Sequence, residues 1–183
     1  MAGGGRNGRA PQGREAERKG ENAVKTTALV LCLMIPLGAI ASDDAAPKGF
    51  QMWTKASLAE MARTLTQKAA SDSHHLALQQ LADYPNDTAI YVHREADGTP
   101  EIHETQVDVT LFLSGSATLL VGGTLTGGET VSPHEIRNGA IQGGVRQKVS
   151  AGDVVRVPAG TPHQMLLAAG EEITYLVIKV KGY

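Results

Sequence analysis

The chain has 183 residues, with 17 Lys and Arg against 19 Asp and Glu and a formal net charge of −2. This length indicates one domain with additional segments rather than two domains. The charge argues against a strongly basic nucleic-acid-binding protein, because DNA and RNA attract basic surfaces.

The first 41 residues are interpreted as two segments that lie outside the folded domain. Residues 1–23 are rich in Gly, Arg and Glu without an apolar period, so we expect them to be disordered or to precede the true start codon, for which Val24 is a candidate. Residues 24–41 have the pattern of a signal peptide, with Lys25, an apolar run over 28–37 and a small-x-small cleavage site ending at Ala41. A membrane anchor or a core helix is the alternative, but the run is short for about 30 Å of hydrocarbon.

Cleavage after Ala41 changes the charge of the chain. Six of the basic and three of the acidic residues lie in the removed part, so the remaining 142 residues carry a net charge of −5. The only cysteine, Cys32, is also removed, and the mature chain therefore has no disulfide. We expect an exported protein, periplasmic or secreted, with no nucleic-acid partner and no stable membrane insertion after cleavage.

A linker and one helix are predicted before the main domain. Residues 42–53 are polar, with Pro47 and Gly49, and are interpreted as a linker. Residues 54–70 are predicted to form a packing helix, because its apolar residues recur at spacings of three and four. These residues are Leu58, Met61, Leu65 and Ala69, and Thr54 or Ser57 is the expected N-cap. We expect this helix to pack on the main domain or on a partner subunit.

Residues 71–183 change to a period of two, which is typical of strands. Strands are predicted at 75–82, 88–94, 107–113, 117–121, 146–149, 154–157, 164–167 and 173–179. We expect Ser114 and Gly115 to form a tight connection, and residues 122–144 to form a Gly-rich loop insertion. Many short strands with frequent turns predict an all-β fold, an antiparallel sandwich or barrel.

The most specific motif is residues 152–163, GDVVRVPAGTPH. We expect a buried valine strand over 154–157, then a tight reversal in which Gly160 can take a positive φ, and then His163 at the start of the next strand, facing the interior. The motif resembles the second signature of the cupin superfamily, which is Gly, five residues, Pro-x-Gly, two residues and His. The resemblance implies a cupin-type jelly-roll β-barrel.

A second segment resembles the first cupin signature, which is His-x-His, three or four residues, Glu, six residues and Gly. Gly115 sets the register and places Asp108 at the Glu position, His103 at the second His and Glu101 at the first. The segment therefore looks like this signature with two substitutions. The resemblance covers about half of the mature chain and implies a metal site.

The residues themselves also favour a metal. His103, Asp108 and His163 supply two imidazoles and one carboxylate, a set that suits non-haem Fe(II) and also accepts Mn, Zn or Ni. Gln106 is a further candidate ligand, and Glu101 is a fourth ligand or the catalytic general base. Buried carboxylates are costly without a cation. The alternative is that Asp108 caps a turn and His163 is a satisfied core histidine.

Other residues have weaker assignments. His93 and Tyr91 are candidates for the cavity mouth, with a structural role as the alternative. Phe112 and Met165 share parity with Asp108 or His163 and are candidates for an apolar pocket wall. The 122–144 insertion, including Glu135 and Arg137, is a candidate lid or pocket rim.

Two main functions remain open. The first is a metal-dependent enzyme acting on a small molecule, because the family that the chain resembles includes dioxygenases, isomerases and decarboxylases. The second is a non-catalytic binding module for a small, sugar-like ligand without metal, and a purely structural dimer partner is a third option. The apolar face of Val109, Leu111 and Leu113, together with residues 75–82, predicts a homodimer.

Overall fold

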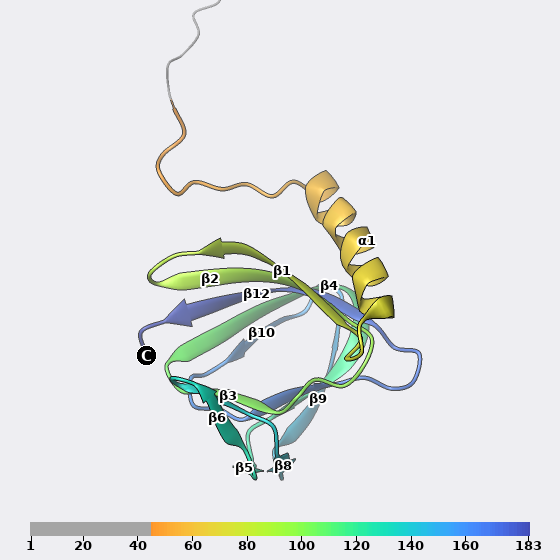
Figure 1. The fold of residues 1–183 in the computed structure, drawn as a ribbon, viewed down its shortest axis with the longest axis vertical. Coiled ribbons are helices and arrows are strands. Elements are labelled where there is room, and N and C mark those ends of the chain that lie inside the picture. Colours follow the sequence, from red (N-terminus) through yellow and green to blue (C-terminus); the bar gives the residue numbers. More distant parts are fainter. Residues whose placement is uncertain (1–44) are drawn as a thin grey trace, which may run out of the picture. The chain divides into compact units, whose positions relative to one another are not determined.

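The structure of the protein is a computed structural model that describes residues 45–183 (Figure 1). The segment predicted at 1–23, the leader predicted at 24–41 and the start of the linker predicted at 42–53 lie outside the described residues. Among residues 45–183, no helix has the length and apolarity needed to cross a membrane.

One helix and twelve strands make up the described part of the chain. The helix is α1 Lys55–Ser71. The strands are β1 Leu76–Asp83, β2 Asp87–Arg94, β3 Glu101–His103, β4 Gln106–Val121, β5 Thr124–Thr126, β6 Glu129–Ser132, β7 Glu135–Arg137, β8 Ala140–Gln142, β9 Val145–Ser150, β10 Val154–Val157, β11 His163–Leu166 and β12 Ile173–Lys181.

Ten of these strands form a continuous antiparallel sheet that curls into two layers (Figure 1). The first layer has the order β1-β2-β12-β4-β10, and the second has the order β9-β4-β11-β3-β7-β6. Strands β5 and β8 form a separate two-stranded ribbon. The predicted all-β jelly roll with one short helix is thereby confirmed.

Strand β4 joins the two layers, and here the prediction of two strands with a turn at Ser114 and Gly115 is wrong. Gly115 has φ +78°, and a Cβ atom at this position would lie 1.9 Å from the Glu172 carbonyl oxygen. The register to β12 shifts between Thr174 and Tyr175 beside it. A glycine in the left-handed region therefore bends a continuous strand instead of ending it.

Helix α1 covers the outer face of the first layer. Its N-cap is Thr54, whose hydroxyl accepts a hydrogen bond from the Ser57 amide at 3.1 Å. Leu65 and Ala69 are fully buried against Ala77 and Tyr91. The predicted apolar face of the helix thus packs on β1 and β2.

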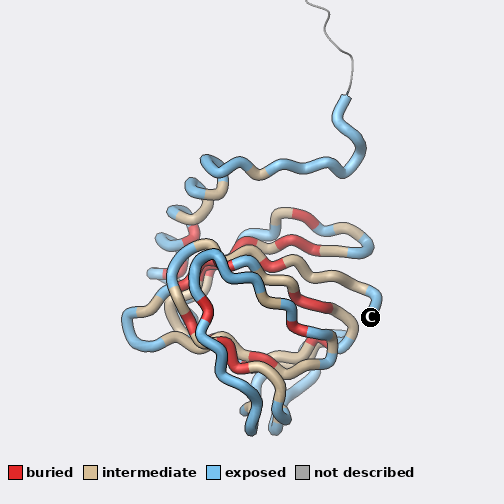
Figure 2. The backbone as a smooth tube through the Cα atoms, turned by 180° about the vertical axis from the view of Figure 1, so that it is seen from behind, coloured by how far each residue is buried: buried red, intermediate tan, exposed pale blue. Residues whose placement is uncertain are grey.

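The main core lies between the two layers, where Figure 2 shows buried segments facing each other across the curled sheet. It contains Phe112, Ala117, Leu119, Val149, Val157 and Ile173. Val157 is buried but Val154 is 64% exposed, so the expectation that every valine of β10 is buried is wrong. Alternation of side chains along the strand turns Val154 and Arg156 outward.

The insertion predicted as a loop at 122–144 instead contains four short strands, β5 to β8. Strand β7 pairs with β3, and Ile102 lies opposite Ile136. Strand β6 then pairs with β7 at the edge of the second layer. Because β3 holds Glu101 and His103, this pairing brings the insertion directly against the candidate site.

Candidate metal centre

One strand pair and one turn bring His103 and His163 together, although the two residues are far apart in the sequence. His163 lies opposite Glu101 in the β11–β3 pair. The turn before β11, with Gly160 at φ +72°, donates its Gly160 amide to the His103 carbonyl oxygen at 2.8 Å. The two imidazole ring centroids are 5.2 Å apart, with an angle of 61° between the ring planes.

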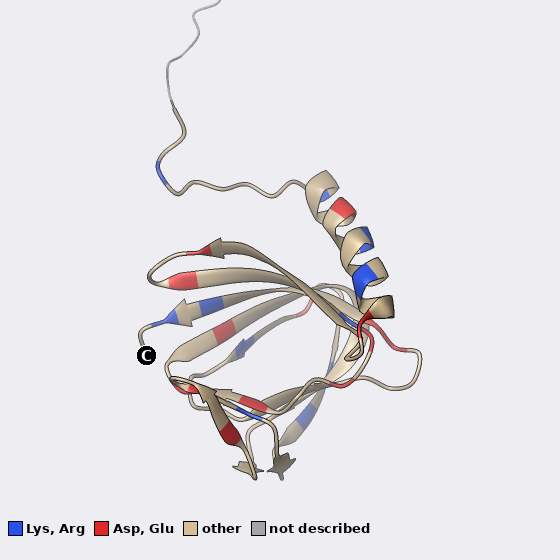
Figure 3. Cartoon of the chain, viewed as in Figure 1, with Lys and Arg blue, Asp and Glu red and all other residues tan. Residues whose placement is uncertain are grey.

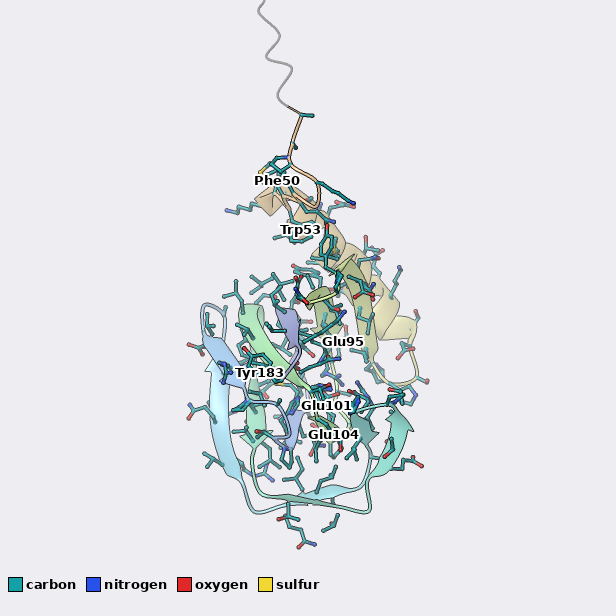
Figure 4. The ribbon with its side chains drawn as sticks, turned by 90° about the vertical axis from the view of Figure 1, so that its left-hand side faces the viewer. Phe50, Trp53, Glu95, Glu101, Glu104 and Tyr183 are labelled. Atoms are coloured by element: carbon teal, nitrogen blue, oxygen red, sulfur yellow. The ribbon has the colours of Figure 1, made fainter. Side chains whose placement is uncertain are left out.

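Four potential ligand atoms converge beside these rings. Glu101 Oε1 lies 3.8 Å from His103 Nε2 and 3.4 Å from His163 Nε2. Asp108 Oδ2 lies 3.4 and 3.7 Å from the same two nitrogens. Ligands about 2.1 Å from a tetrahedral ion lie roughly 3.4 Å from each other, so these separations fit one small cation. Glu101, His103 and His163 each offer one ligand atom, and these three atoms lie within 4.8 Å of one another. Figure 4 labels Glu101 among the strands.

His163 has a free ligand atom in this cluster. Its Nδ1 donates to the Thr161 carbonyl oxygen at 3.0 Å, so the neutral imidazole has its lone pair on Nε2. That Nε2 is buried and has no hydrogen-bond partner. A backbone bond that orients the imidazole is the usual support for a metal ligand. The orphaned Nε2 is therefore the strongest structural sign that the cluster accommodates a metal ion.

His103 is oriented from the insertion. Its Nδ1 lies 2.5 Å from Glu135 Oε2, which directs Nε2 toward the cluster. Arg137 contacts both carboxylates, with its Nη2 3.0 Å from Glu101 Oε2 and 2.6 Å from Glu135 Oε1. Strand β7 thus supplies the supporting contacts for two of the candidate ligands, as the pocket-rim interpretation of the insertion proposed.

Lys179 places a positive charge at the same cluster. Its Nζ lies 2.9 Å from each Asp108 oxygen and 2.7 Å from His103 Nε2. Figure 3 shows the acidic segment of β4 beside the basic segment of β12, and Asp108 and Lys179 lie opposite each other in that pair. One proton bridges Nζ and the imidazole, because two donors at this distance would repel. A metal bound to His103 Nε2 must displace this hydrogen bond.

The carboxylates of the site are ionised. Burial opposes ionisation of Glu101, but His163, Arg137 and His103 together hold its pKa at about 2. Burial also opposes ionisation of Asp108, whereas His103 and Lys179 lower its pKa. Burial lowers the pKa of His103, but the Asp108 and Glu135 carboxylates outweigh it and raise that pKa to about 9. A metal that binds His103 at neutral pH must therefore also displace a proton from its imidazole.

A cavity of about 140 Å³ opens beside the cluster. Its charged and imidazole groups are Glu101, Asp108, His163, Lys179, Arg94 and Arg137. Most of the wall is apolar, as predicted for Phe112 and Met165, and also includes Leu76, Leu78, Ile90, Val92, Leu119, Val155, Val157 and Val177. Such a lining suits a small ligand with an apolar body and few polar groups.

Gln106, His93 and Tyr91 are absent from the cavity lining. Gln106 is the first residue of β4, opposite Lys181, and does not line the cavity. His93 and Tyr91 lie outside the cavity lining, and Tyr91 packs in the cluster beneath α1. His93 Nδ1 is 2.9 Å from Thr174 Oγ1 and its Nε2 is 3.2 Å from Glu95 Oε1, which supports the structural alternative.

The sequence reasoning missed one residue at the centre of the site. Lys179 is the last residue of the strand predicted at 173–179, and the sequence assigns it no role in the site. Its position is i+2 from Val177 and i+4 from Tyr175, which both line the cavity. This period of two could have placed it on the interior face.

No protein-family model and no curated protein matches the sequence. Solved structures do resemble it. The polyketide cyclase RemF of Streptomyces resistomycificus is 17% identical over 57% of this chain and 64% of that chain, with a TM-score of 0.41. The Cnp3 cupin domain of Schizosaccharomyces pombe is 14% identical over 58% and 64%, with a TM-score of 0.44. Rru_A2000 of Rhodospirillum rubrum, a cupin-2 domain, is 17% identical over 57% and 59%, with a TM-score of 0.43.

The chain spans about three fifths of the length of these three structures. At such identities and TM-scores they carry no argument about activity, ligand or partners. The observations that bear on function are the jelly-roll strand order, the glycine turn before β11 and the cluster of Glu101, His103 and His163.

Proposed function

We propose that this chain, which belongs to the cupin superfamily by its jelly-roll strand order and its residues 152–163, binds one divalent metal ion and a small-molecule ligand. Glu101, His103 and His163 would hold the metal, and the adjoining cavity would hold the ligand. The observation that supports this most is the buried, unpartnered Nε2 of His163. A metal in such a site supplies Lewis acidity toward an oxygen atom of a bound ligand.

We assign Glu101 to ligation rather than to proton transfer. A carboxylate whose pKa is held at about 2 is a weak proton acceptor at neutral pH. Its Oε1 faces the two imidazoles, while its Oε2 is bound by Arg137. Asp108 is engaged by Lys179, so its carboxylate becomes available as a further ligand only when Lys179 moves.

The test is metal content of the protein produced from Ser42 onward. Wild type should bind about one equivalent of Fe, Mn, Zn or Ni, and His103→Ala and His163→Ala should each lose it. His134→Ala is a suitable control, because His134 is 60% exposed and lies outside the cluster. Equal metal content in all four proteins would reject this ligand assignment.

A second candidate function is a metal-free binding module for a small ligand. Two contacts of Lys179 favour this metal-free alternative. Its Nζ already occupies His103 Nε2, and it already supplies the positive charge beside Asp108. In that case Lys179 would be a permanent part of the site. Wild-type protein that takes up no divalent metal and still binds a ligand in the cavity would support this alternative. If the protein does bind metal, the enzyme hypothesis should be tested by assays for oxygenase, isomerase and lyase activity.

Export and pairing complete the proposal. Residues 24–41 support an exported, periplasmic or secreted protein, which N-terminal sequencing of the protein from culture fractions can test.

Leu111 and Val154, neighbours across β4 and β10, are 37% and 64% exposed and offer an apolar patch for a homodimer. Light scattering that gives the mass of one mature chain at micromolar concentration would contradict the dimer.

A further inference from the structure

Three cationic side chains line the cavity, and two of them already have carboxylate partners. Arg137 pairs with Glu101 and Glu135, and Lys179 pairs with Asp108. The third is Arg94. Among the ion pairs of residues 45–183, none involves Arg94. The cavity therefore has one positive charge that the described protein does not neutralise.

The hydrogen bonds of Arg94 are also incomplete. A guanidinium has five N–H donors. In the described chain, Arg94 donates from Nη1 to the Asp97 carbonyl oxygen at 3.3 Å and also lies beside the Tyr175 hydroxyl. Its Nε is buried and has no hydrogen-bond partner. A partly buried charge with an unpaired donor is unfavourable, and an anion that paired with it would offset that cost.

The position of Arg94 is fixed by the turn that follows β2. Gly98 donates its amide to the Met165 carbonyl oxygen at 2.7 Å, and Asp97 Oδ1 accepts from the Leu167 amide at 2.7 Å. This holds the turn against β11. A Cβ atom at Gly98 would lie 3.3 Å from Arg94 Cζ, so the missing side chain leaves room for the guanidinium.

Arg94 also lies where a ligand would enter. Besides the inner cavity of about 140 Å³, a wider outer cavity of about 550 Å³ is present. Arg94 and Arg137 line both, with Leu76, Leu78, Thr99 and Glu101 as the other shared residues. The inner cavity has an apolar wall and is about the size that accommodates a benzene-sized group.

We propose that Arg94 binds the carboxylate of a small ligand whose apolar body fills the inner cavity. This proposal rests on the proposed function and specifies its ligand class, a monocarboxylic acid of roughly six to nine non-hydrogen atoms. The paired N–H groups of a guanidinium can each donate to one oxygen of a carboxylate. An amide or an alcohol has only one such oxygen and carries no negative charge. Arg94 is a binding residue in this proposal, and among the described residues it makes no ion pair with Glu101.

The test compares acids with their neutral amides by isothermal titration calorimetry. The probes are benzoate against benzamide and hexanoate against hexanamide, with wild type, Arg94→Met, Arg94→Lys and the control Arg156→Met. Arg156 is exposed on β10 and does not line the cavity. Wild type and Arg156→Met should prefer each acid over its amide by about tenfold or more. Arg94→Met should lose this preference, and Arg94→Lys should retain part of it.

Three results would overturn the inference: an unchanged acid preference in Arg94→Met, equal binding of acid and amide by wild type, or no binding of any probe. Acid preference that survives in Arg94→Met but disappears when EDTA removes the metal would assign the carboxylate to the metal instead. Metal content of each variant is measured in parallel. An Arg94-dependent preference without metal would defeat the metal proposal alone, so the two failures are distinguishable.

Discussion

The Nζ atom of Lys179 lies 2.7 Å from Nε2 of His103, the atom that a metal at this site would need. Lys179 and a metal ion therefore compete for the same lone pair. The same lysine also holds Asp108 at 2.9 Å through both carboxylate oxygens. The positive charge that balances Asp108 and Glu101 can thus come from a lysine of the chain or from a bound metal ion.

Replacing Lys179 by methionine should tighten metal binding. The variant removes a charge-assisted hydrogen bond to His103, worth about 1.5–3 kcal/mol, and frees Asp108 as a further ligand. We expect a divalent metal to bind at least about tenfold more tightly, measured by competition with a chelating dye. Lys181→Met is the matched control, because Lys181 lies on the same strand and pairs with Asp83 instead. Equal affinity in both variants would show that Lys179 does not compete.

Glu135→Gln should weaken metal binding while leaving all candidate ligands in place. Glu135 orients His103 through Nδ1, and loss of such a supporting contact costs about 10–100-fold in metal affinity. Glu104→Gln should bind metal like wild type, since Glu104 is 48% exposed and pairs with His134 outside the cluster. The same metal competition assay measures both. An undiminished affinity in Glu135→Gln would remove β7 from the metal centre.

Gly115→Ala should destabilise the fold more than Gly170→Ala. Both glycines have a positive φ, so alanine at either costs about 1–2 kcal/mol. Only at Gly115 does the new Cβ meet the backbone, 1.9 Å from the Glu172 oxygen, whereas nothing lies within 4 Å at Gly170. We expect Gly115→Ala to lose at least about 3 kcal/mol in urea unfolding, or not to fold. Equal losses would mean that β4 does not bend at this position.

Asp72 should make stability depend on acid pH. Hydrogen bonds from the His74 and Leu76 amides lower its pKa from the ordinary value of 3.8. Its contribution is therefore complete above pH 3.8 and is lost as the pH falls through the lower folded-state pKa. Asp72→Asn should show a smaller loss of stability over that interval, measured by urea unfolding at a series of pH values. Parallel curves for the two proteins would contradict this role.

The sequence predicted the features that depend on nearby residues, such as turns and the helix face. It missed the residues whose position depends on which strands pair in the sheet. Glycine, proline and histidine spacing identified the turn before His163, and the helical period identified the face of α1. The Ser114–Gly115 pair resembles a turn locally, and only the contact with Glu172 across the sheet shows that it is a bend. Glu135 and Arg137 reach the site because β7 pairs with β3. The sequence does not predict this pairing, because a strand of three residues is too short to show a period of two. Lys179 was missed because a lysine near a strand end usually lies in solvent.

The most direct test is diffraction from crystals soaked in Zn²⁺ or Mn²⁺, with data collected at the absorption edge of the metal. We predict one strong anomalous peak within about 2.5 Å of His103 Nε2, His163 Nε2 and a Glu101 oxygen, with Lys179 turned away from His103. An anomalous map without a peak there, and with Lys179 still bonded to His103, would contradict the metal centre.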